Sequence, residues 1–204
     1  MKRIIAVLTV ASALLLSGCS QVGVAASIGS TKITQATVQK SIDTVLAERK
    51  KVVTTGMTLD TGETLNRGQL RFHLMATLLG DVATDGKISV TKAEIDARRA
   101  TILTQIGGAA ALPKALVGAG IASIDLDTYL QLIILSEKLQ AAAVAAGIPQ
   151  ANTGTEIQKL ISAKAIKLKV TVNPRYGTWD SAAGDIVAAT SASSATTPVP
   201  TPTK

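Results

Sequence analysis

The stretch Ile166-Lys167-Leu168-Lys169-Val170-Thr171-Val172 alternates strictly between apolar and polar residues, which is the pattern of a half-buried β-strand. A single strand is not stable alone, so this one needs a partner. The best second candidate is the small apolar run from Val24 to Ile28, near the opposite end of the chain, which stops at the turn signal Gly29-Ser30. We therefore expect a two-stranded sheet formed by the N-terminal and C-terminal segments of one domain.

The chain between these two strands shows helical spacing and helix caps. Thr34 is expected to cap a first helix, and a second helix is expected from near Thr64 to just before the turn pair Asp85-Gly86. Thr91-Lys92-Ala93-Glu94 is a complete capping box, which predicts a third helix that runs to about Ile106.

The longest predicted helix covers roughly residues 126–146. Asp125 is its expected cap and Gly147 its expected end. Apolar residues surround most of its circumference, so we expect it to be buried at the centre of the domain. Residues 107–124 are rich in Gly and Ala and predict a loop with one short helix, and another short helix should follow the turn at 152–154. The predicted fold class is mainly α, a multi-helix domain with a small two-stranded sheet.

The first nineteen residues have the form of a bacterial export signal. Met1-Lys2-Arg3 is a positive segment, Ile4 to Leu16 is an uncharged, mostly apolar run, and Leu16-Ser17-Gly18-Cys19 matches the bacterial lipobox. The motif implies cleavage before Cys19, diacylglycerol on its thiol and an acyl chain on the new amino group. We therefore expect a signal peptide at 1–18, a lipidated Cys19 with a tether at 19–23, and a mature protein outside the cytoplasm, anchored to the cell membrane by lipid.

Composition narrows the remaining classes of function. The chain has 204 residues, one histidine, one cysteine and 2% aromatic residues, with 21 Lys+Arg against 14 Asp+Glu. The usual zinc sites need about four N or S ligands, and stacking of nucleic-acid bases needs more aromatic side chains. We expect no metal, no cofactor and no nucleic-acid partner. The excess of positive charge has two explanations: attraction to anionic lipid headgroups, or an ordinary solvated surface with a modest excess of basic residues.

Two catalytic or metal-binding patterns are weak. The segment from Asp81 to Lys92 resembles part of an EF-hand loop but has Lys92 where the bidentate Glu belongs. His73 has neither a nucleophile elbow nor an oriented Asp nearby in the sequence, so we expect no catalytic triad.

The tail at 181–204 is composed mainly of Ser, Thr, Ala and Pro and is expected to be disordered.

Three segments of the sequence carry a family resemblance. They are Ala25-Ala26-Ser27-Ile28-Gly29-Ser30-Thr31-Lys32-Ile33-Thr34, Ile88-Ser89-Val90-Thr91-Lys92-Ala93-Glu94-Ile95 and Val170-Thr171-Val172-Asn173-Pro174-Arg175-Tyr176-Gly177-Thr178-Trp179. The first is similar to the opening strand, turn and Ile-Thr cap of the SurA N-terminal domain family, and the second resembles a later helix start of that domain. The third resembles the end of the short actinobacterial lipoproteins that carry this domain. The resemblance covers about residues 24–180.

The resemblance implies a chaperone-like fold that cradles unfolded polypeptide in a helical surface beside a small sheet. Full SurA and PrsA proteins also carry parvulin prolyl isomerase domains of about ninety residues, for which this chain has no room, so we expect no enzyme activity. The leading hypothesis is a chaperone-like lipoprotein that binds unfolded or extended polypeptide. The alternative is a structural or adaptor lipoprotein that holds one envelope protein.

One stripe on the second predicted helix is the candidate peptide-binding surface. It contains Phe72, Met75, Leu78 and Leu79. Methionine and aromatic side chains adapt to varied partners, although the same spacing is also typical of core packing. Lipid attachment at Cys19 is the other predicted site.

Overall fold

The computed structural model describes residues 22–188. The predicted signal peptide, the lipid attachment at Cys19, the first part of the tether and residues 189–204 of the predicted tail lie outside this range.

The predicted pairing of the two ends of the domain is confirmed. Strand β1 (Val24–Ile28) pairs antiparallel with β3 (Thr171–Val172), with Ala26 opposite Val172 and Ser27 opposite Thr171. The sheet has a third strand, because the turn at Gly29-Ser30 folds β2 (Thr31–Thr34) back onto β1, and the strand order is β2-β1-β3.

The predicted strand at 166–172 was too long. Helix α6 (Thr153–Lys167) occupies its first two residues, because Ile157, Ile161 and Ala165 recur at helical spacing and are buried on its inner face. The helix then ends in a Schellman motif: the amide of Val170 donates to the carbonyl of Ala165 at 3.0 Å, and Lys169 takes a left-handed φ of 51°. Only Thr171 and Val172 remain in the strand.

The predicted disordered tail starts too early. Strand β4 (Thr178–Asp180) pairs antiparallel with β5 (Asp185–Val187), which lies inside the segment expected to be disordered. Ile186 is buried in the main core and supplies the apolar contact that the composition of the tail did not suggest. The folded domain therefore extends past residue 180 to Val187.

The described chain is mainly helical, as predicted. Its α-helices are α1 (Gln35–Arg49), α2 (Gly62–Asp85), α3 (Lys92–Gln105), α4 (Leu112–Ala119), α5 (Leu126–Ala145) and α6. The short 3₁₀ turns are η2 (Ala109–Ala111), η3 (Ser123–Asp125), η4 (Gln150–Asn152) and η5 (Pro174–Tyr176). The expected caps at Thr34 and Thr91 are present, the second as a full capping box with Glu94.

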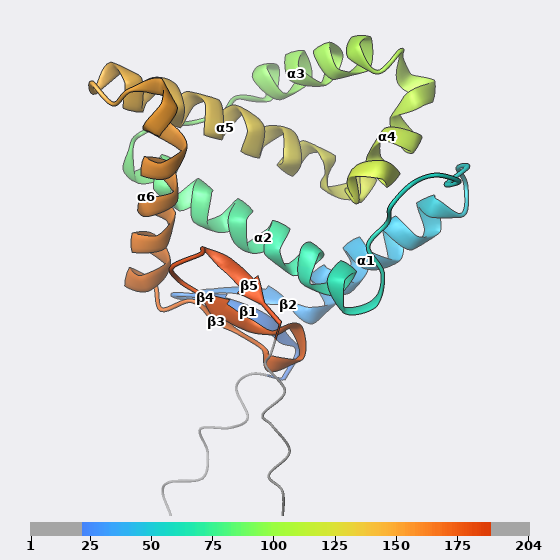
Figure 1. Ribbon diagram of the computed structural model, residues 1–204, viewed down its shortest axis with the longest axis horizontal. Helices are drawn as coiled ribbons and strands as arrows, with labels where there is room; N and C mark the ends of the chain where they lie inside the picture. Colours follow the sequence, from blue (N-terminus) through green and yellow to red (C-terminus); the bar gives the residue numbers. More distant parts are fainter. Residues whose placement is uncertain (1–21, 189–204) are drawn as a thin grey trace, which may run out of the picture.

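The centre of the domain is α2, and not α5 as the sequence suggested. Leu70, Leu74 and Leu78 of α2 are fully buried. Figure 1 shows α2 running between α5 on one side and the two sheets on the other, with α1 and α6 packed against it. The buried residues of α5 are divided between this main core and a smaller cluster around Leu116, so α5 joins two apolar clusters rather than filling one.

Within residues 22–188, none of the helices taken singly has the length and hydropathy to cross a membrane. The segments Lys92–Gln105 and Ala109–Ala119 together have sufficient length and hydropathy, but the chain bends by 86° between them.

Candidate functional site

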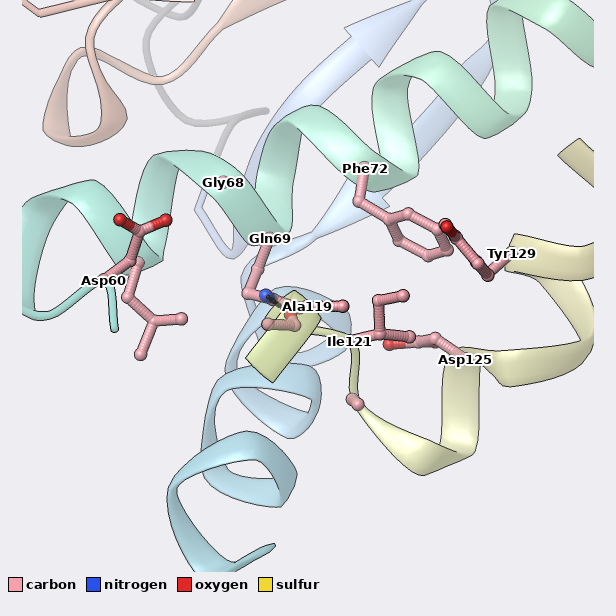
Figure 2. A pocket seen from close by; sticks show the side chains of 11 residues that line it. Asp60, Gly68, Gln69, Phe72, Ala119, Ile121, Asp125 and Tyr129 are labelled. Atoms are coloured by element: carbon pink, nitrogen blue, oxygen red, sulfur yellow. Dashed lines mark hydrogen bonds between the residues drawn. The ribbon is translucent and has the colours of Figure 1, made fainter. Parts of the chain in front are cut away.

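A cavity of about 250 Å³ lies between the first half of α2 and the connection from α4 to α5 (Figure 2). One wall is the face of α2 that carries residues 65, 68, 69 and 72, which follow the spacing of a single helical face. The other wall is residues 119–122 with Asp125 and Tyr129, and Asp60 lies at one end. The full lining is Asp60, Leu65, Gly68, Gln69, Phe72, Ala119, Gly120, Ile121, Ala122, Asp125 and Tyr129.

Two glycines line this cavity. A Cβ atom added at Gly68 would meet no atom within 4 Å, so this turn of α2 leaves space where a side chain would stand. Gly120 has a φ of 66° and ends α4 in the left-handed conformation that favours glycine. The side-chain amide of Gln69 donates to the carbonyl of Gly120 at 2.8 Å and so ties the two walls together.

Aromatic and acidic side chains define the chemistry of the cavity. Figure 2 shows Phe72 from α2 and Tyr129 from α5 pointing toward each other at one end, while Asp60 lies at the opposite end. Asp125 lies on the wall formed by η3. The lining contains two carboxylates and no Lys, Arg or His.

A polar cluster behind the cavity joins α1, α2 and η3. The hydroxyl of Ser41 lies 2.6 Å from Oδ2 of Asp125 and 3.0 Å from Nε2 of His73. Ser41 is 1% exposed, and burial lowers the pKa of His73, a shift that the nearby Asp125 carboxylate partly opposes. The sequence predicted no triad, and the structure nevertheless brings these three residue types together.

Hydrogen-bond counting assigns the protons of this cluster. An ionised Asp125 only accepts, so the single hydroxyl proton of Ser41 is donated to it. Nε2 of His73 must then be the donor to the Ser41 oxygen. In a nucleophilic triad the carboxylate binds the histidine, whereas here Asp125 accepts from Ser41, so the three residues are not arranged as a triad. The cluster holds three elements together and fixes the position of Asp125 at the cavity wall.

The four predicted peptide-binding residues do not share one surface. Phe72 lines the cavity. Leu78 is fully buried, Leu79 is 6% exposed, and Met75 is partly buried and packs against the same core. The prediction was wrong for Leu78 and Leu79, since the stripe at that end of α2 faces the core between the sheets and the neighbouring helices. Met75 is held by the same packing.

The sequence did not point to most of the lining. Asp60, Gln69 and Gly120 come from three separate segments, and no local pattern links them. Asp125 is predicted only as the cap of the helix at 126–146, and Tyr129 lies near the start of that helix. The signals that could have suggested the site were Gly68 inside a predicted helix and Gln69 beside it on the same apolar face, since both depart from a plain core pattern.

The partial EF-hand segment has a different role. Asp85 pairs with Lys164 of α6, and the hydrogen bond from that lysine lowers the pKa of the Asp85 carboxyl. Across residues 22–188, no three His, Cys, Asp or Glu side chains gather in a group that could hold a metal ion.

Comparisons with protein-family models, with curated proteins and with solved structures gave no match to this chain.

Proposed function

We propose that this protein is a lipid-anchored, extracytoplasmic, chaperone-like protein that binds unfolded or extended polypeptide without catalysis. The observation that carries the proposal is the open cavity beside α2, in which Phe72, one of the predicted contact residues, faces Tyr129. The lipobox at residues 16–19 supplies the proposed anchor at Cys19.

The size of the cavity suits a side chain of a larger ligand. Sites that enclose a whole small molecule have volumes of about 300–1,000 Å³. A cavity of about 250 Å³ is below that range, so it fits one or two side chains of a chain that lies across its mouth. Binding of this kind needs neither ATP nor a reaction.

The pairing of β1 with β3 supports a relation to the SurA N-terminal domain. That resemblance implies a small sheet built from the two ends of the domain, and β1 and β3 come from those ends. We propose the same general arrangement here, with the helices of residues 35–167 presenting the binding surface.

Lipid would hold the domain at the membrane. Removal of the signal segment takes away Lys2 and Arg3 and leaves a mature chain that is still basic. A single acyl chain binds membranes weakly, whereas two or more hold firmly. Mass spectrometry of protein purified from a bacterial host membrane tests this part: we expect cleavage before Cys19 and added acyl chains, and an unmodified N-terminus would refute it.

Suppression of client aggregation tests the binding function. Protein starting at Ser20 is mixed with a chemically denatured client, and light scattering is followed after dilution. We expect scattering to fall as the protein is added in increasing amounts, and binding to a panel of extended peptides. Absence of both effects would overturn the proposal.

Co-purification separates the chaperone from an adaptor. Many substoichiometric clients after cross-linking are expected for a chaperone-like protein. One stoichiometric envelope protein would instead favour the adaptor function.

A further inference from the structure

We propose that the cavity between α2 and the α4–α5 connection takes a positively charged side chain, arginine or lysine, of a bound polypeptide. This inference rests on the proposed polypeptide-binding function and names the part of the ligand that the cavity selects. It follows from the hydrogen-bonding groups, the charge and the aromatic rings of the lining.

The polar side chains of the cavity are mainly acceptors. Asp60 and Asp125 contribute carboxylates, and Oδ1 of Asp125 is left over because Oδ2 accepts from Ser41. Gln69 is 6% exposed, its amide nitrogen is used by Gly120, and no hydrogen bond from the described part of the chain reaches its Oε1. These oxygens line the cavity and can accept from a ligand that brings N–H groups.

The charge of the lining has the sign that attracts a cation. Two carboxylates and no basic residue line this cavity, on a chain whose formal net charge is +7. The nearest cation that contacts a lining residue is Arg49, and its guanidinium donates to the backbone carbonyl of Asp60 at 2.7 Å rather than to the carboxylate. The carboxylate of Asp60 makes no ion pair with any residue of the described range.

The aromatic residues complete the match. Phe72 and Tyr129 supply ring faces and edges at the end opposite Asp60 (Figure 2). The alkyl stem of an arginine or lysine packs on apolar surface such as that of Phe72, Leu65 and Ile121, while its charged group lies toward a carboxylate of the lining. Arginine and lysine each combine an apolar stem with several N–H donors. Those donors match the acceptor oxygens of the lining.

Isosteric probes test the proposal on the full chain in non-ionic detergent. Two extended ten-residue peptides differ only at their central residue, which is arginine in one and citrulline, its neutral isostere, in the other. The side-chain analogues ethylguanidinium and N-ethylurea form a second matched pair. Binding is followed by the amide NMR signals of Gly68 and Gly120 at low ionic strength, where screening is weak.

We expect the arginine peptide to bind about tenfold more tightly than the citrulline peptide. Asp60→Asn and Asp125→Asn should each weaken the arginine peptide about three- to fivefold, the range for partly exposed charge pairs, and the double variant should remove most of the preference. Asp96→Asn on α3, away from the lining, is the matched control and should leave both affinities unchanged.

The outcomes separate the two proposals. Equal binding of the two peptides would overturn the cation preference and leave polypeptide binding intact. Shifts with ethylguanidinium but with neither peptide would support the cation site and overturn the polypeptide function. Absence of binding by every probe would overturn both.

Discussion

Two lysines hold a backbone conformation that is unfavourable for residues with a Cβ atom. Lys87 after α2 and Lys169 after α6 have φ values of 56° and 51° and occupy the left-handed position of Schellman motifs. Replacement of either lysine by glycine relieves about 1–2 kcal/mol of strain but adds chain entropy to the unfolded state.

We expect Lys87→Gly and Lys169→Gly each to raise the free energy of unfolding by about 0.5–1 kcal/mol. Urea denaturation followed by circular dichroism measures the change. Lys92→Gly, at the first position of α3, is the control and should destabilise the protein. A loss of stability in both Schellman variants would contradict this explanation.

Glu94 links stability to pH. Its side chain accepts from Lys138 and from the backbone and hydroxyl of Thr91, and these bonds lower its pKa from 4.5 to about 2. A carboxyl with a lowered pKa in the folded state stabilises the fold above the unfolded pKa, and this stabilisation is lost as pH falls.

The stability advantage of the native chain over Glu94→Gln should therefore be constant above pH 5 and should shrink between about pH 4.5 and 2. Chemical denaturation at a series of pH values measures it. Glu63→Gln is the comparison variant, because Glu63 is exposed and pairs with the half-buried Arg67 at 3.5 Å. A difference between native and Glu94→Gln that does not change with pH would count against the account.

Single-residue predictions succeeded where the chemistry was local. The caps at Thr34 and Thr91 depend on residues within three positions and could be predicted from the sequence. Asp125 makes no side-chain capping bond, because its carboxylate accepts instead from Ser41, a residue 84 positions away. Because Ser41 is so distant in the sequence, no local pattern could show that its hydroxyl would bind the Asp125 carboxylate in place of the helix amides.

At the scale of elements, α2 has two ends with different roles. Its second half is core, with Leu74 and Leu78 fully buried, and its first half opens onto the cavity at Gly68 and Phe72. Leu78→Ala should lower the free energy of unfolding by about 2–5 kcal/mol, as expected for a buried leucine.

Phe72→Ala should cost less stability than Leu78→Ala, because the phenylalanine is only half-buried, but it should weaken peptide binding. Urea denaturation and peptide titration of the same two variants give both quantities. Weak binding by a folded Leu78→Ala protein together with unaffected binding by Phe72→Ala would place the site elsewhere.

The β4–β5 hairpin depends on a glycine. Gly177 has a φ of 123°, and a Cβ atom there would overlap the carbonyl oxygen of Val187. Gly177→Ala should detach the hairpin, and Trp179, the only tryptophan in the chain, reports this as a shift of its emission. Gly118→Ala in α4, where a Cβ has open space, is the control and should be neutral or stabilising by up to about 1 kcal/mol. Unchanged Trp179 emission in Gly177→Ala would show that the hairpin tolerates the substitution.

Element boundaries were harder to predict than element types. The alternation at 166–172 predicts a strand, yet Ile166 and Lys167 belong to α6, because the buried residues earlier in that helix continue its packing to Lys167. The strand at 185–187 has little local signal and is stabilised by its pairing with β4 and by the buried Ile186. In both cases tertiary packing outweighs the short-range pattern.

At the scale of the whole molecule, the sequence predicted the topology better than the site. The mainly helical class and the meeting of the two chain ends follow from strong periodic segments. The cavity is built from residue 60, residues 65–72 and residues 119–129, which the packing of α2 against the α4–α5 connection brings together. Sequence periodicity could place Phe72 on the apolar face of α2. It could not show which half of that face is covered by the core and which half opens onto the cavity.

The central claim is that polypeptide binds in this cavity, and a matched pair of variants tests it most directly. Gly68→Leu places a side chain into the cavity from α2, and Gly80→Leu makes the same change farther along the same helix; a Cβ at either glycine meets no atom within 4 Å. Both variants should fold, since leucine is a better helix former than glycine. Peptide affinity measured by titration should fall at least tenfold in Gly68→Leu and stay unchanged in Gly80→Leu, and equal affinities of a folded Gly68→Leu protein and the native protein would contradict the account.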